Sequence, residues 1–103
     1  MVLKYNANVD NEDIKKSLAR ITNLVFKILP QREEGGEWES TLRNLIVEVV
    51  GMNNLFNDQV NLFPVLCKME GLLTLTKEED FLLFRKGIFE CLSLLNGISK
   101  CLD

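Results

Sequence analysis

A capped apolar stretch over residues 76–96 constrains the fold of this chain more than any other feature. It opens with Thr76-Lys77-Glu78-Glu79, in which a hydroxyl and a carboxylate three residues later have the spacing of a capping box. The apolar residues that follow fill about half of a helix circumference: Phe81, Leu83, Phe84, Ile88, Cys91, Leu92, Leu94 and Leu95. We therefore expect a central helix over residues 77–96, covered by the other helices.

A first helix is predicted over residues 11–29. Asp10 or Asn11 can cap it, and apolar residues follow at steps of four and three: Ile14, Leu18, Ile21, Val25 and Ile28. Pro30 is expected to end this helix, because the residue before a proline avoids the α conformation. Residues 30–37 then form a flexible connector, whose two glycines lack the Lys-Ser/Thr of a phosphate-binding loop.

Two more helices are predicted between this connector and the central helix. The apolar phase of the second, over residues 37–56, continues past Gly51, although that glycine could also terminate the helix. The third spans residues 62–74, with Asn61 as its cap and Pro64 in the first turn, where a missing amide costs no hydrogen bond. Gly87 lies inside the apolar arc of the central helix, so another helix can cross close to it.

These elements predict an all-α protein with four helices at about 11–29, 37–56, 62–74 and 77–96. The short links favour an up-down bundle, and a short helical-repeat-like array is the alternative. Residues 1–10 are expected to form an extended or disordered arm, and residues 11–103 a single helical domain. A chain of 103 residues with 47% hydrophobic and 26% charged residues fits one small globular domain.

The location and the kinds of partner are constrained by what the chain lacks. No apolar run approaches about 18 residues, so we expect no membrane span, and the N-terminus lacks the apolar segment of a signal peptide. An intracellular protein, cytoplasmic or nuclear, follows. The net charge of −3 argues against nucleic acid as a partner, because binding it usually needs a basic face.

The residue types needed for common catalytic sites are missing or poorly placed. The chain has no histidine, which removes His-based acid–base chemistry and the His-containing zinc sites. Its three cysteines contain no CxxC pair, and in a reducing compartment they are most simply core residues. The paired carboxylates lie in or beside the glycine loop or at a helix cap, and none has the buried, apolar setting that acid–base catalysis needs. We therefore predict no enzyme, no cofactor and no metal site.

Basic residues are concentrated at the start of the chain. Residues 1–32 carry six basic and three acidic groups, whereas residues 33–103 carry six basic and twelve acidic groups. This pattern is consistent with solvated helix faces. It is also consistent with a basic first helix that meets an acidic partner, including another copy of the chain.

Some apolar residues do not belong to the stripes that build the core. Leu82 and Phe89 are seven residues apart, on the side of the central helix that also carries Arg85. Phe26 stands away from the stripe of the first helix. An apolar pair one heptad apart beside an arginine is typical of a helix contact surface. The competing interpretation is that both faces of the central helix are core.

The four residues Phe26, Leu82, Arg85 and Phe89 therefore form the predicted partner interface. The function that follows is a non-catalytic protein-interaction module: an adaptor, an assembly subunit or an oligomeric regulatory factor. Its partner is another protein chain, possibly a second copy. The first alternative is a helical bundle that binds an apolar small ligand, and the second is a small carboxylate or metal enzyme.

Overall fold

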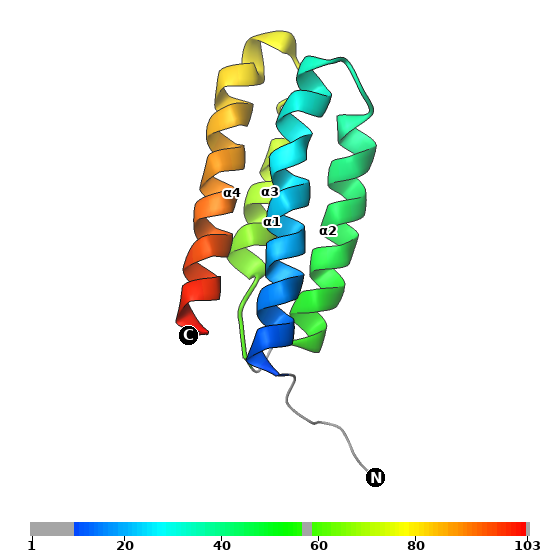
Figure 1. Cartoon of the computed structure of the whole chain (residues 1–103). Helices are drawn as coiled ribbons and strands as arrows, with labels where there is room; N and C mark the ends of the chain where they lie inside the picture. Colours follow the sequence, from blue (N-terminus) through cyan, green and yellow to red (C-terminus); the bar gives the residue numbers. More distant parts are fainter. Residues whose placement is uncertain (1–9, 57–58, 103) are drawn as a thin grey trace.

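The computed structural model describes residues 10–56 and 59–102, which form helices and no strands. The elements are α1 (Asn11–Glu33), α2 (Trp38–Leu55), α3 (Phe63–Leu72), the short 3₁₀ helix η1 (Glu78–Asp80) and α4 (Phe81–Cys101) (Figure 1). The predicted all-α class is confirmed. The arm predicted over residues 1–10 lies outside the described residues, apart from Asp10, which caps α1 by accepting a hydrogen bond from the Glu12 amide.

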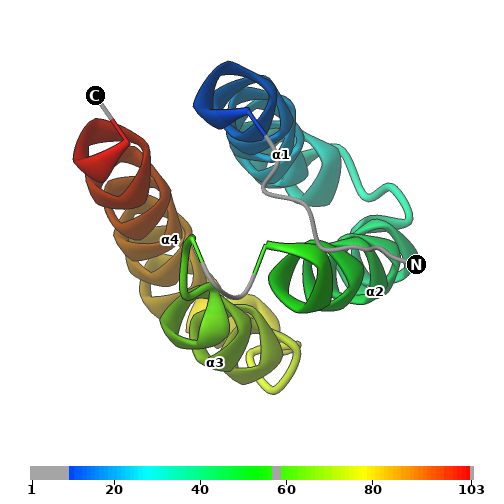
Figure 2. The same cartoon turned by 90° about the horizontal axis from the view of Figure 1, so that it is seen from below.

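The four helices lie side by side around a common interior. Helix α1 packs against α2 and α4, and α3 packs against the same two helices, so the first and last helices are neighbours. Viewed end-on, the helices occupy four corners, and consecutive helices run in opposite directions (Figures 1 and 2). Because a linear repeat array would keep the first helix away from the last, this packing favours the bundle over the array.

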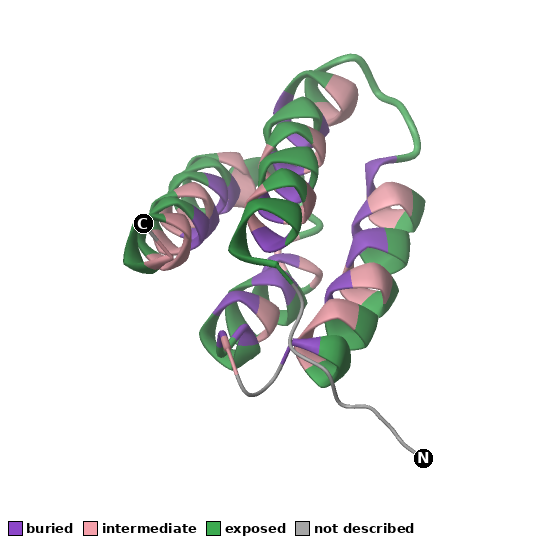
Figure 3. Cartoon of the chain, turned by 60° about the horizontal axis from the view of Figure 1, so that its bottom comes forward, coloured by how far each residue is buried: buried purple, intermediate pink, exposed green. Residues whose placement is uncertain are grey.

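The predicted apolar stripes meet in the interior. All five residues of the α1 stripe are buried, and α4 contributes four buried residues, Phe84, Ile88, Cys91 and Leu95. No polar or charged residue of the described part of the chain is buried. In Figure 3 the buried turns face one another and the exposed turns face outward. The core is therefore held together by apolar burial alone, without a polar network.

The prediction that Leu83 belongs to the core is wrong. Its side chain is 59% exposed and borders a surface groove between α3 and α4 that is also lined by Gly71 and Leu75. Gly71 has no side chain to cover it, and α3 ends one residue later, at Leu72. Leu83 does lie on the α3 side of α4, as the apolar spacing predicts, but α3 is too short to bury its side chain.

The prediction that Pro30 ends the first helix is also wrong, because α1 continues to Glu33. Its end is a Schellman motif, in which the Gly35 and Gly36 amides donate to the carbonyls of Arg32 and Gln31 at 3.0 and 2.8 Å. Gly35 takes the left-handed conformation, with φ of 76°, that this motif requires. The glycine pair thus has a defined structural role as a helix terminator rather than as a loose connector.

Helix α4 does not begin at the predicted Thr76 cap. The Lys77 amide instead donates to the Asp80 carboxylate at 3.4 Å, and η1 precedes the helix. The reason is a contact from α1: the Arg32 guanidinium donates to the carbonyls of Leu75 and Lys77 at 2.5 and 2.8 Å, which fixes this link. At its other end α4 continues beyond the predicted residue 96 to Cys101.

Most of the remaining local predictions agree with the structure, although α3 ends at Leu72 and not at the predicted residue 74. Helix α2 passes through Gly51 without interruption. Pro64 lies in the first turn of α3. The cap residue is Leu62 and not the predicted Asn61, although the Asn61 side chain accepts a hydrogen bond from the Phe63 amide at 3.1 Å. A Cβ atom built on Gly87 would lie 2.4 Å from Leu72 Cδ2, so this glycine does allow α3 and α4 to approach closely.

Candidate functional site

The predicted interface residues are all on the surface. Leu82 is 76% exposed, Phe26 55% and Phe89 43%, and Arg85 is exposed as well. The interpretation in which both faces of α4 are core therefore fails at these positions. Other large apolar residues of the described chain are also exposed: Val47, Val50, Leu55, Phe63 and Leu83. What distinguishes the predicted set is its arrangement.

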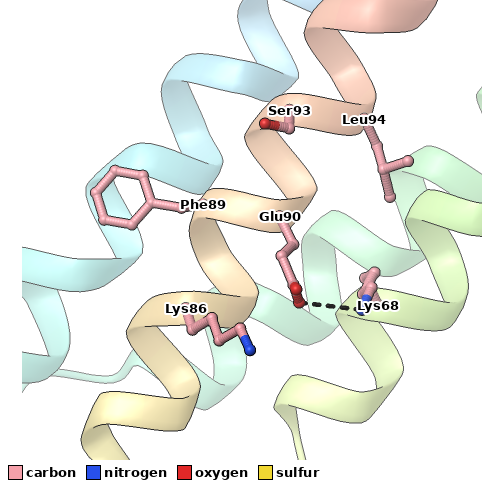
Figure 4. A pocket seen from close by; sticks show the side chains of 6 residues that line it. All are labelled: Lys68, Lys86, Phe89, Glu90, Ser93 and Leu94. Carbon is pink, nitrogen blue, oxygen red and sulfur yellow. Dashed lines mark hydrogen bonds and ion pairs between the residues drawn. The ribbon is translucent and has the colours of Figure 1, made fainter.

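Leu82, Arg85 and Phe89 form a ridge on the outer side of α4. Their spacing of three and four residues places them on consecutive turns of one helix face. The Arg85 guanidinium carbon lies 5.4 Å from the centre of the Phe89 ring, a cation–π contact that holds the arginine over the aromatic face. In Figure 4 the Phe89 ring points away from α3. The ridge therefore lies on the solvent-facing side of α4, away from the core.

Phe26 lies on the same side of the molecule, across the seam between α1 and α4. A groove of about 220 Å³ follows this seam and is lined by Leu18, Ala19, Thr22, Asn23, Leu95, Asn96 and Ser99. Phe26 is one turn beyond Thr22 on α1, and Phe89 is two turns before Asn96 on α4. Because the two helices are antiparallel neighbours (Figure 1), both rings extend the groove toward the same end.

We call this surface the α1–α4 face and define it by Phe26, Leu82, Arg85 and Phe89 together with the groove. Its edge on the α3 side is a second, open groove of about 560 Å³, lined by Lys68, Lys86, Phe89, Glu90, Ser93 and Leu94 (Figure 4). The Lys68 ammonium and Glu90 carboxylate form an ion pair at 3.0 Å across this second groove. Phe89 therefore lines the second groove and lies two turns of α4 away from Asn96 in the seam groove.

The chemistry available elsewhere in the described residues is limited. Burial raises the pKa of the Cys91 thiol to about 12, so this sulfur is protonated and unreactive at neutral pH. Cys67 and Cys101 are exposed, so the expectation that all three cysteines are core residues is wrong for these two, which lie on outward helix positions. No group of three or more His, Cys, Asp or Glu residues in residues 10–56 and 59–102 is placed to hold a metal ion. No helix there is long and apolar enough to cross a membrane.

Sequence reasoning did not find the cluster around Arg32. The Arg32 guanidinium lies 4.5 Å from the Trp38 ring centre and 4.4 Å from that of Phe84, while its nitrogens bond the link before α4. The two rings contact each other edge-on at 4.8 Å. These partners come from three separate segments, so no local sequence pattern predicts the cluster. It joins the ends of α1, α2 and α4, and its role is structural.

The fold and this surface define a small all-α bundle with an exposed apolar ridge beside a seam groove. No protein-family model matches the chain, and neither a curated protein nor a solved structure matches it. Its function is therefore argued from the α1–α4 face itself.

Proposed function

We propose that the protein is a non-catalytic protein-interaction module and that the α1–α4 face is its binding surface. The observation that carries this proposal is the convergence of Leu82, Phe89 and Phe26 on one face although the core is complete without them. Large apolar residues that gather on one face, with a cation among them, are typical of the centre of an interface. Scattered single apolar residues need no such explanation.

The energetics indicate how much of the face a partner must cover. Burying Leu82 and Phe89 would contribute about 3–5 kcal/mol, at the usual value for large apolar side chains. Association costs at least about 4 kcal/mol in lost translational and rotational freedom. These two residues alone would therefore give weak binding, and a stable complex must also cover Phe26 and the seam groove.

The packing of the core favours this proposal over a bundle that binds an apolar ligand. A ligand of that kind needs an enclosed space between the helices. Large side chains with almost no exposure fill the inward positions instead, among them Phe84, Ile14, Leu18, Leu42 and Met69. The grooves described above are open to solvent at the helix surfaces.

The proposal is tested by paired substitutions that spare the core. We expect Leu82→Glu with Phe89→Glu to abolish partner binding or self-association, measured by affinity capture from the source cell and by light scattering. Val47→Glu is the matched control, because Val47 is 72% exposed on the outer side of α2. Circular dichroism should show unchanged helix content in both variants. Equal binding by the wild-type protein and the double variant would rule out this face.

A further inference from the structure

The charge of the two helices that form the α1–α4 face is opposite to that of the whole chain. Between residues 14 and 32, α1 carries basic side chains and no carboxylate: Lys15, Lys16, Arg20, Lys27 and Arg32. Helix α4 carries Arg85, Lys86 and Lys100, and its single carboxylate, Glu90, is paired with Lys68 of α3. Because the net charge is −3, the acidic groups are concentrated on the other elements.

Two of these cations, both on α4, border the apolar residues of the α1–α4 face. Arg85 and Lys86 lie between Leu82 and Phe89 along α4, and both are exposed. On α1, Lys27 is exposed but lies on the α2 side of the helix, where it lines a groove together with Thr41. Arg20 and Arg32 are engaged within the molecule, the first with Glu48 of α2 and the second with backbone carbonyls. A ligand on this face therefore meets apolar side chains flanked by positive charge.

We infer that the occupant of the α1–α4 face is an acidic amphipathic helix of a different protein. This inference rests on the proposed function and adds the chemistry of the partner. The seam groove is lined partly by small side chains, Ala19, Thr22 and Ser99, which let a third helix approach. The apolar stripe of such a helix would lie on Phe26, Leu82 and Phe89. Carboxylates on the flank of that helix would face Arg85 and Lys86, giving charge complementarity.

Charge also argues against a second copy as the occupant. A symmetric dimer uses the same patch on both subunits. If two α4 helices paired antiparallel about the midpoint between Leu82 and Phe89, Arg85 and Lys86 would face the same two cations of the other copy. Like charges placed together in an interface are unfavourable. An acidic chain removes this conflict.

The same face is less suited to nucleic acid or to an anionic membrane. A phosphate backbone pairs with the cations but leaves Leu82, which is 76% exposed, without an apolar partner. A flat lipid surface does not fill a groove between two helices. Both ligands are nevertheless included as competitors in the test.

The test uses a defined probe, a display library of helical peptides about 20 residues long. Leucine occupies the i, i+3, i+4 and i+7 positions, and Glu, Lys, Gln or Ser varies freely elsewhere. Selection on the full chain is expected to enrich peptides with a net negative charge. A single-stranded DNA oligonucleotide and phosphatidylserine vesicles, titrated in parallel, are expected to bind more weakly than the enriched peptides.

Charge variants then locate the binding. We expect Arg85→Glu with Lys86→Glu to weaken binding of the enriched peptides by about tenfold or more, and a peptide with Glu exchanged for Lys to restore it. Arg85→Gln with Lys86→Gln removes the charges without introducing repulsion and should give a smaller loss of the same sign. Arg43→Glu on α2 is the control and should leave the affinity unchanged, with circular dichroism reporting the fold of each variant.

The outcomes separate this inference from the proposed function. Two results would overturn the inference that the partner is acidic but leave the interaction surface in place. The first is enrichment of neutral or basic peptides. The second is binding that is unchanged by charge reversal but lost in the Leu82→Glu and Phe89→Glu variant. Tighter binding of the oligonucleotide or the vesicles would also overturn it. Both proposals would be contradicted if no enriched peptide lost affinity on either the Arg85 and Lys86 substitutions or the Leu82 and Phe89 substitutions.

Discussion

At the scale of single residues, Arg32 does the most to connect separate parts of the chain. It contacts Trp38 and Phe84 by cation–π interactions and donates to two carbonyls of the link before α4. Hydrogen bonds from charged groups contribute about 1.5–3 kcal/mol each when buried and less when solvated. Because Arg32 is half-buried, its contacts are worth more than those of an exposed arginine.

We therefore expect Arg32→Ala to lower the free energy of unfolding by about 2 kcal/mol. Arg85→Ala, at an exposed position, should change it by less than about 0.5 kcal/mol. Urea denaturation followed by circular dichroism measures both values. Equal midpoints for the two variants would show that the Arg32 cluster does not hold the helix ends together.

Cys91 gives a prediction about pH. Burial raises the pKa of its thiol from 9.0 to about 12, so between these values the unfolded chain loses this proton while the folded chain keeps it. The contribution of this thiol to stability is therefore fully present below pH 9 and is lost as the pH rises toward 12, because the folded state binds more protons. Cys91→Ala should show a shallower loss of stability over this range. Parallel curves for the two proteins would mean that the thiol is not protected by the core.

At the scale of elements, the end of α1 and the start of α4 differ from the positions that Pro30 and Thr76 predict. Pro30 is a strong local signal, yet α1 continues for one more turn that carries Arg32 to its partners. Likewise the Thr76 hydroxyl has the right spacing for a cap, but the link around it is fixed by α1. The apolar stripe of α1 was predictable because it depends on periodicity within one helix.

The two glycines of α4 should respond in opposite directions to replacement by alanine. Nothing lies within 4 Å of a Cβ atom at Gly97, so Gly97→Ala should stabilise the protein by up to about 1 kcal/mol through helix propensity. At Gly87 the new methyl group would meet buried Leu72 at 2.4 Å, and overpacking costs about 1–3 kcal/mol. Thermal melts of both variants measure the difference. Stabilisation by Gly87→Ala would mean that α3 and α4 pack less closely than described.

At the scale of the whole molecule, the sequence predicts less of the candidate site than of the fold. Helical phase was enough to place Leu82 and Phe89 away from the α4 core. It could not place Phe26 on the same surface, because that depends on α1 and α4 being neighbours across a seam. The placement of Arg85 and Lys86 beside this face likewise depends on how α4 packs in the bundle. Leu83 was assigned to the core because the sequence does not give the length of the helix opposite.

The most direct test of the central claim is site-specific photocrosslinking in the source cell. A benzoylphenylalanine placed at Phe89 should give a discrete crosslinked species, because this ring would lie in the interface with the partner. The same probe at Val47, on the outer side of α2, should give none. Adding Leu82→Glu to the Phe89 probe should abolish the crosslink while helix content is unchanged. Crosslinking of equal yield at both positions, or a Phe89 crosslink that survives Leu82→Glu, would contradict the assignment of the α1–α4 face as the interaction surface.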